Sequence, residues 1–322
     1  MYLSGTRYPV YRRYRAKWRL GTWYRSIPWQ TAGMSEEPSE VEIAQAAAEP
    51  AGPGERGLKP IDAIERANVK APTRGNRRLE ALLEGINDDP EVRGWWHMAQ
   101  LNSERLAMSD HSWVHVQIVL NIALRLLRLL VKGGVEPAMV ADHGMRDRDA
   151  EVVVASGALL HDVGMSIHRA DHEAFSLFLA ERKLRELLAD VYPDGERTIV
   201  IAECLHAIIG HRRRGEPYTV EAGVVRVADA LDMAHGRSRI PVEAGQQGIH
   251  AISAAAIDSI DIAAGENKAV KIEIAMNNSA GVFQVDDLLA TKLRGTPLAE
   301  HVEVVASVQG EAEKRLLDEF RI

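Results

Sequence analysis

The chain has 322 residues, a formal net charge of -7 at pH 7 and a hydrophobic fraction of 46%. This length accommodates one core domain of about 150 to 200 residues together with further segments. The acidic balance disfavours nucleic-acid binding through a globally basic surface. Because Cys204 is the only cysteine, an internal disulfide and a cysteine-rich zinc site are excluded, and we expect a reducing, cytoplasmic setting.

Residues 1–34 differ chemically from the sequence that follows. Arginine and lysine alternate there with tyrosine and tryptophan, and no acidic residue precedes Glu36. Such a stretch could hold single-stranded nucleic acid or lie on a membrane surface. Met34, however, begins a sequence typical of a natural start, and residues 36–60 are rich in Glu, Ala, Pro and Gly. We therefore predict that residues 1–60 form an unstructured tail and linker, the one region where nucleic-acid binding is conceivable.

The segment 61–245 has the pattern of a helical domain. Its apolar residues recur mostly at helical spacing as far as Met233, and breaks containing glycine and proline divide the pattern into separate helices. The longest apolar stretch, residues 116–131, contains polar side chains and is shorter than the roughly 18 residues of a membrane span. We therefore predict a core helix there and no membrane span.

The period of the pattern changes after about Ile249. Apolar residues alternate with others over 270–276, Ile260 and Ile262 form a similar run, and the turn at 264–268 would join the two as a hairpin. Helix, strand and helix are then predicted in that order at 286–293, 301–306 and 311–320. The predicted fold is mainly α, with a helical bundle followed by a small α+β module at 249–322.

The clearest chemical feature is an apolar helix that runs into adjacent His161 and Asp162 and then reaches Gly164. Neighbouring side chains on a helix diverge by about 100°. Both can therefore hold one metal only at a helix end or a distortion, and Gly164 supplies such a place. The alternative is that the two residues only cap the helix and form local hydrogen bonds.

Two more residues turn this weak dipeptide signal into a stronger one. His115 lies 46 positions before His161 (161 − 115), and Asp229 lies 67 positions after Asp162 (229 − 162). Each belongs to a separate helical segment with an apolar face, so the side chains are expected to meet in a common core. Imidazole and carboxylate ligands suit Mn, Fe, Ni, Co or Zn, whereas the lack of thiolate argues against a closed structural zinc site.

In this order, His115, His161 with Asp162, and Asp229 resemble the H…HD…D signature of the HD-domain metal-dependent phosphohydrolase superfamily. The stretches HVQIVLNIALRLL, ALLHDVGM and VVRVADALDM are similar to that family's ligand helices and central turn, so the resemblance covers roughly residues 100–240. It implies a helical bundle that hydrolyses phosphomonoesters or phosphodiesters, often of nucleotides. The implied cofactor is one or two divalent ions, of Mn, Fe, Ni, Co, Zn or Mg.

The resemblance also implies further ligands, because family members with two metals place additional histidines between the HD pair and the last aspartate. His172, His206 and His211 lie in this interval and are candidates for a second metal, with Asp162 as the bridging carboxylate. For each of them a buried histidine held by a backbone carbonyl is the alternative. His168 lies there too and is a candidate to protonate the leaving group.

Phosphate requires positive side chains near the metal ligands. Arg169, like Asp162, is a candidate catalytic residue. Arg212, Arg237 and Arg239 are candidates to bind the substrate phosphate. The alternative for the arginines is a solvated loop.

One position departs from the family pattern. Many catalytic members carry lysine in an HDxGK motif, and Met165 stands there in this chain. Hydrolysis would then rely on Arg169, or the substrate would differ, or the protein would bind a nucleotide without turning it over. Two neighbours of the core set also stay open: Asp232 could replace Asp229 or form an ion pair, and His111 could join the ligands or begin a helix.

Three functions follow from these residues. The leading one is a metal-dependent hydrolase of a small phosphorylated substrate, in a chain that could form a homo-oligomer. The second is a non-catalytic sensor or interaction module that keeps the metal or nucleotide, which the missing lysine favours. The third is a di-iron oxygenase, because the same ligand types can also activate dioxygen.

Overall fold

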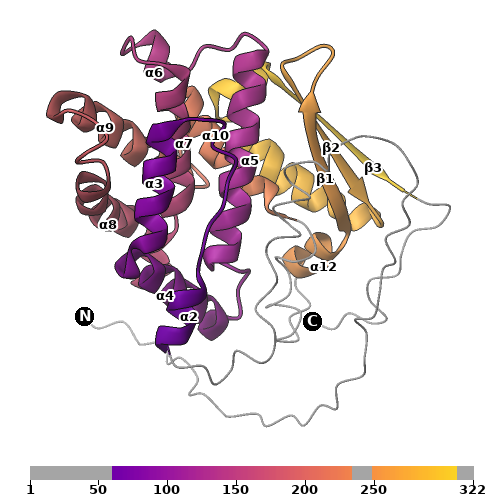
Figure 1. The fold of residues 1–322 in the computed structure, drawn as a ribbon. Helices are drawn as coiled ribbons and strands as arrows, with labels where there is room; N and C mark the ends of the chain where they lie inside the picture. The colour runs from indigo at the N-terminus through magenta and orange to yellow at the C-terminus, as the bar shows by residue number, and fades with distance from the viewer. Residues whose placement is uncertain (1–59, 234–248, 310–322) are drawn as a thin grey trace, which may run out of the picture. The chain divides into compact units, whose positions relative to one another are not determined.

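The computed structural model describes residues 60–233 and 249–309 (Figure 1). The expected tail and linker before residue 60, Arg237, Arg239 and the helix expected at 311–320 lie outside the described residues. The described chain forms helices first and a small sheet with short helices afterwards, which confirms the predicted fold class.

Helices make up the first part of the described chain. In chain order they are α2 (Pro60–Arg66), α3 (Arg77–Asp88), α4 (Pro90–Leu106), α5 (Trp113–Lys132), α6 (Ala138–Ala141), α7 (Asp147–Leu160), η2 (Val163–Ser166), α8 (His172–Leu187), α9 (Asp194–Gly210) and α10 (Val220–Leu231). Several begin at a residue whose side-chain oxygen accepts hydrogen bonds from backbone N–H groups of the first turn, as Asn76, Asp89, Ser112 and Thr219 do. The sequence thus encodes where these helices start.

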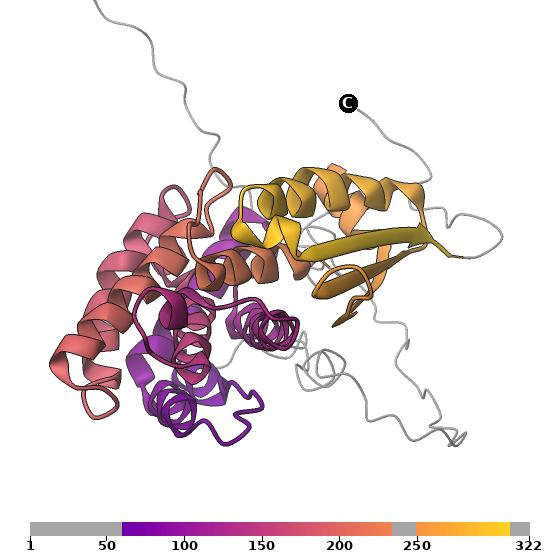
Figure 2. The same cartoon turned by 90° about the horizontal axis from the view of Figure 1, so that it is seen from above.

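The helix α5 forms the centre of the helical core. It packs against α7 and α10, and Figures 1 and 2 show the three side by side. Among the described residues it is the one helix long and apolar enough to cross a membrane, but 67% of its most apolar window is buried inside the protein. The predicted core helix at 116–131 is therefore confirmed. It begins at Trp113, because Ser112 caps it, and Asp110 Oδ1 accepts a hydrogen bond from the Ser112 N–H.

The HD dipeptide lies where α7 ends and the short 3-10 helix η2 begins. His161 caps the end of α7, and Asp162 precedes η2. Ser176 of α8 donates its hydroxyl to the His161 carbonyl at 2.6 Å and accepts the Gly164 N–H at 2.9 Å. The helix end that the sequence required for the two adjacent side chains is present, and α8 holds it in place.

A small α+β module follows in the described residues. Its elements are α12 (Ile249–Ala255), β1 (Ile257–Ala264), β2 (Val270–Met276), η4 (Ser279–Gly281), η5 (Gln284–Ala290), α13 (Thr291–Arg294), η6 (Pro297–Glu300) and β3 (Val302–Val308). Strand β2 pairs antiparallel with β1 and parallel with β3. The hairpin expected around 264–268 is present, and the helix expected at 286–293 is longer, because the π-helical η5 continues into α13.

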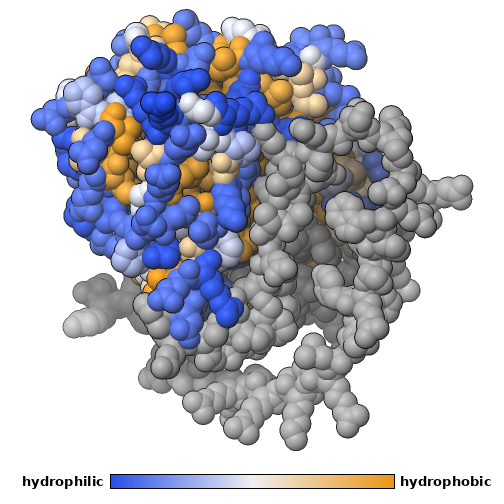
Figure 3. Space-filling view, viewed as in Figure 1, coloured by the Kyte–Doolittle hydropathy of each residue, from blue (hydrophilic) through white to orange (hydrophobic). Residues whose placement is uncertain are grey.

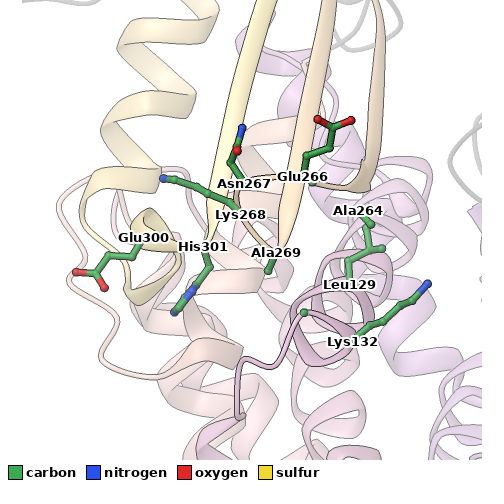
Figure 4. A pocket seen from close by; sticks show the side chains of 11 residues that line it. Leu129, Lys132, Ala264, Glu266, Asn267, Lys268, Ala269, Glu300 and His301 are labelled. Carbon is green, nitrogen blue, oxygen red and sulfur yellow. The ribbon is translucent and has the colours of Figure 1, made fainter.

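A surface depression of about 460 Å³ lies where the end of α5 meets the β1–β2 turn (Figure 4). Lys132, Lys268, Glu266 and His301 are among its lining residues. Lys132 follows His115 by 17 residues on the same helix (132 − 115), so the depression lies about 25 Å from that histidine along the helix axis. Figure 3 shows mostly hydrophilic residues on the visible face of the helical part, with apolar residues in small areas between them.

Gly164 allows η2 to lie directly on the first turn of α8. A Cβ at this position would lie 2.0 Å from the His172 carbonyl oxygen and 2.6 Å from the Ser176 nitrogen. Because both contacts are backbone, we expect Gly164→Ala to lower the free energy of unfolding by about 3 kcal/mol or more. Gly94→Ala in α4 is the control, since nothing lies within 4 Å of its added Cβ. Urea unfolding followed by circular dichroism measures both, and equal stabilities would contradict this packing.

Candidate metal centre

Four side chains from three distant segments lie together inside the helical part of the chain. His115 is in the first turn of α5, His161 and Asp162 follow α7, and Asp229 is in the last turn of α10. All four are buried, and Asp229, the most exposed of them, is 7% exposed. The start of α5 therefore meets the ends of α7 and α10 at one cluster of imidazole and carboxylate groups.

The donor atoms have the spacing of metal ligands. The Nε2 atoms of His115 and His161 are 3.1 Å apart, and Asp162 Oδ2 lies 3.4 Å and 3.3 Å from them. Asp229 Oδ1 lies 3.5 Å and 3.9 Å from the same two nitrogens. Ligands about 2.1 Å from one ion and at angles of roughly 90 to 110° lie about 3.0 to 3.4 Å apart. The four donors could therefore surround one divalent cation.

The other oxygen of Asp162 faces a second group. Asp162 Oδ1 lies 3.1 Å from His172 Nε2 and 3.6 Å from His211 Nε2. His172 begins α8 and His211 caps the end of α9, so both are at helix ends. The donor atoms of Asp162, His172 and His211, the second group, lie within 4.8 Å of one another. The same holds for the donor atoms of His115, His161 and Asp229, the first group. The arrangement could hold one or two ions, with Asp162 between them.

Acceptors outside the cluster fix the orientation of the rings. The Nδ1 atoms of three histidines face such acceptors: His115 faces Asp232 Oδ2 at 2.6 Å, His161 the Ala158 carbonyl at 2.8 Å, and His211 the Ile208 carbonyl at 2.5 Å. Because these oxygens accept hydrogen bonds, Nδ1 carries the proton in the neutral form of each ring, and the Nε2 lone pair then points into the cluster. Metal-binding histidines are held in this way. Two lone pairs facing each other at 3.1 Å repel without a cation, which favours metal binding over local capping.

The charges around Asp162 keep it ionised. Burial by itself raises the pKa of Asp162, but its interactions with the neighbouring imidazoles of His161, His111 and His115 outweigh burial and bring the pKa well below its ordinary value. Burial also lowers the pKa of His172, yet the hydrogen bond to Asp162 outweighs this effect and raises it. For His211 burial dominates and lowers the pKa. An ionised carboxylate and a neutral imidazole are the forms that bind metals.

Two predicted histidines lie apart from these groups. His206 is half-buried, its ring stacks on Tyr218 with 4.2 Å between the centroids, and its Nε2 accepts the Tyr218 N–H at 3.2 Å. It precedes His211 by five residues, so the two side chains point about 140° apart around the helix axis. The structure therefore does not bring His206 into the second group. His168 is exposed, and its Nδ1 accepts the Ala170 N–H at 3.0 Å.

Of the predicted arginines, Arg169 contacts a candidate ligand. Its Nη1 atom lies 2.8 Å from His172 Nδ1. Arg212 directly follows His211 and is half-buried. Met165 occupies the place of the family's lysine and is fully buried, so it supplies no polar group there.

Three side chains at the cluster were left open or missed by the sequence patterns. His111 lies before α5, with Nε2 3.8 Å from Asp162 Oδ2, and Asp232 holds His115. The sequence pattern placed both residues next to the core set without assigning their roles. Lys292 of α13 forms an ion pair with Asp229 Oδ2. No motif around Lys292 points to this contact, which exists only because the module packs on the helical part.

The two groups predict a pattern of metal loss. We expect purified protein dialysed against Mn²⁺ to hold two ions per chain. His115→Ala and His172→Ala should each hold one ion, because each of these histidines belongs to one group. Asp162→Ala should hold none, because Asp162 faces both groups. Metal analysis by inductively coupled plasma mass spectrometry gives the stoichiometry. His143→Ala is the control, since His143 pairs with Glu203 instead. Two ions in Asp162→Ala would contradict the bridging position.

Asp232 is expected to influence metal affinity without being a ligand. Asp232→Asn removes the charge that holds the proton on His115 Nδ1, so Mn²⁺ should bind about 10- to 100-fold more weakly. Isothermal titration calorimetry measures the affinity. The exposed Asp142→Asn variant controls for the loss of one carboxylate anywhere on the chain. Unchanged affinity in Asp232→Asn would mean that the ring is oriented by its packing alone.

Comparison with known proteins agrees with this geometry. The HD domain family model matches residues 109–234, which include all the residues of both groups. An uncharacterized protein of Methanocaldococcus jannaschii is 38% identical over 218 residues, which cover 68% of this chain and 83% of that protein. No solved structure matches significantly. By its ordered histidines and aspartates, its helical fold and these similarities, the chain belongs to the HD-domain family, part of the metal-dependent phosphohydrolase superfamily.

Proposed function

We propose that the protein hydrolyses a phosphomonoester or phosphodiester of a small molecule, with a nucleotide as the leading substrate class. The observation that carries the proposal is the position of Asp162, whose two oxygens face two separate pairs of buried histidines. A site that holds two divalent ions with one bridging carboxylate suits displacement at phosphorus. Membership of a superfamily of metal-dependent hydrolases supports the same reaction class.

Different residues of the chain are proposed to have different roles in such a reaction. Divalent ions held by Asp162 and the histidines would lower the pKa of a bound water to near 7 and would polarise the phosphoryl oxygens. Asp162 and the four histidines fix the site, and Asp232 orients His115. Arg169, next to His172, is proposed to neutralise the phosphate, and the exposed His168 to protonate the leaving group. Arg212 remains a candidate to bind the phosphate. Arg237 and Arg239 remain candidates for the same role on sequence grounds.

A second function receives support from one observation. Met165 is buried where many family members carry a lysine that assists phosphate binding. A protein without that cation could retain metal and nucleotide and act as a sensor without turnover. The di-iron oxygenase alternative depends on the same ligand set with iron bound. The cytoplasmic setting, the homo-oligomer and the small phosphorylated partner stay predictions from the sequence.

A turnover assay separates these functions. With Mn²⁺, we expect 4-nitrophenyl phosphate or bis(4-nitrophenyl) phosphate to be hydrolysed, and we expect at least a 100-fold lower kcat/KM in His161→Ala and Asp162→Ala. His143→Ala is the matched control and should keep its activity. Absorbance at 405 nm reports the product, and the two substrates distinguish monoesters from diesters.

Three results would redirect the proposal. Nucleotide binding without hydrolysis of either ester or of the nucleotide would favour the sensor. Oxygen consumption by the iron-loaded protein would favour the oxygenase. Turnover that persists in both ligand variants would show that hydrolysis occurs elsewhere.

A further inference from the structure

The C-terminal module places a cation at the candidate metal centre. Lys292 of α13 places its ammonium on Asp229 Oδ2, while Asp229 Oδ1 faces the Nε2 atoms of His115 and His161. The side chains of Lys292 and Asp229 are only 14% and 9% exposed, so this ion pair is shielded from water and differs from an ordinary surface pair.

The backbone of Lys292 is held independently of its side chain. Arg226 of α10 is 2% exposed and donates to the Lys292 carbonyl at 3.0 Å. The same guanidinium donates to the carbonyls of Gly210 at 3.1 Å and Arg213 at 2.9 Å, and to that of Arg212. These carbonyls flank His211. One buried arginine therefore ties together the loop after α9, the helix of Asp229 and the segment of Lys292.

Positively charged side chains contact both groups of candidate ligands. Arg169 contacts His172 in the second group, and Lys292 contacts Asp229 in the first. An incoming phosphate brings up to two negative charges next to Asp162, Asp229 and Asp232, so it needs positive side chains in addition to metals. Met165 supplies none. An ammonium carries three N–H donors, and the contact with Asp229 uses one of them.

We propose that Lys292 is a substrate-binding residue that donates to a phosphate oxygen at the first group, in the role for which the chain lacks a lysine after the HD dipeptide. The C-terminal module is then one wall of the active site. This inference rests on the proposed phosphate chemistry of the centre and adds a residue that no motif indicates.

Inorganic phosphate is the probe that tests this inference. We expect the Mn²⁺-loaded full chain to bind it, Lys292→Met to bind it at least about tenfold more weakly, and Lys292→Arg to stay within about threefold of the unchanged protein. Lys292→Gln keeps a donor for Asp229 but no charge, so it should resemble Lys292→Met and serves if that variant does not fold. Lys271→Met, which removes a partly exposed lysine paired with Glu273 on β2, is the control and should change nothing.

Isothermal titration calorimetry gives the phosphate affinity, and Mn²⁺ content and thermal unfolding are measured on the same samples. If Lys292 only positions Asp229 or ties the module to α10, phosphate affinity will fall together with Mn²⁺ content or stability, and the inference is overturned. It is also overturned if the unchanged protein binds no phosphate, or if the neutral variants bind it equally well. Phosphate binding that depends on Lys292 without turnover of aryl phosphates would leave this inference standing while the proposed hydrolysis fails.

Discussion

A buried carboxylate between two pairs of imidazoles is the constraint on which the rest of this structure depends. Asp162 is 4% exposed, and its oxygens face the nitrogens of His115 and His161 on one side and of His172 and His211 on the other. A buried charge is strongly unfavourable without compensation. Interactions with the neighbouring imidazoles lower its pKa, and a divalent ion on each side would compensate its charge further.

The helical fold meets this constraint through helix ends. His115, His172 and Asp229 lie in first or last turns, and His161 and His211 follow the last residues of α7 and α9. Side chains at helix ends converge on a point more easily than side chains along parallel helices, and the last carbonyls of a helix are available to hold them. The carbonyls of Ala158 and Ile208 do this for two of the rings.

The C-terminal module is connected to this centre more closely than its separate strand pattern indicated. Arg226 joins the module to the loop that carries His211, and Lys292 contacts Asp229. A module attached in this way influences the charge at the centre directly. The proposed role of Lys292 would explain how a chain with Met165 after its HD dipeptide can still bind phosphate.

The sequence by itself determined the class of the fold, the core helix around 116–131 and the β1–β2 hairpin, since helical period and strand alternation are local patterns. The order of His115, His161, Asp162 and Asp229 along the chain also indicated the core set of the cluster. The sequence also pointed to a helix end at Gly164. Only the tertiary structure decided which histidines converge and which cation faces Asp229. His206 and His211 belong to the same helical segment, but their side chains point to different sides of α9. Contacts such as that of Lys292 join residues 63 positions apart (292 − 229), and no local period records how two packed elements meet.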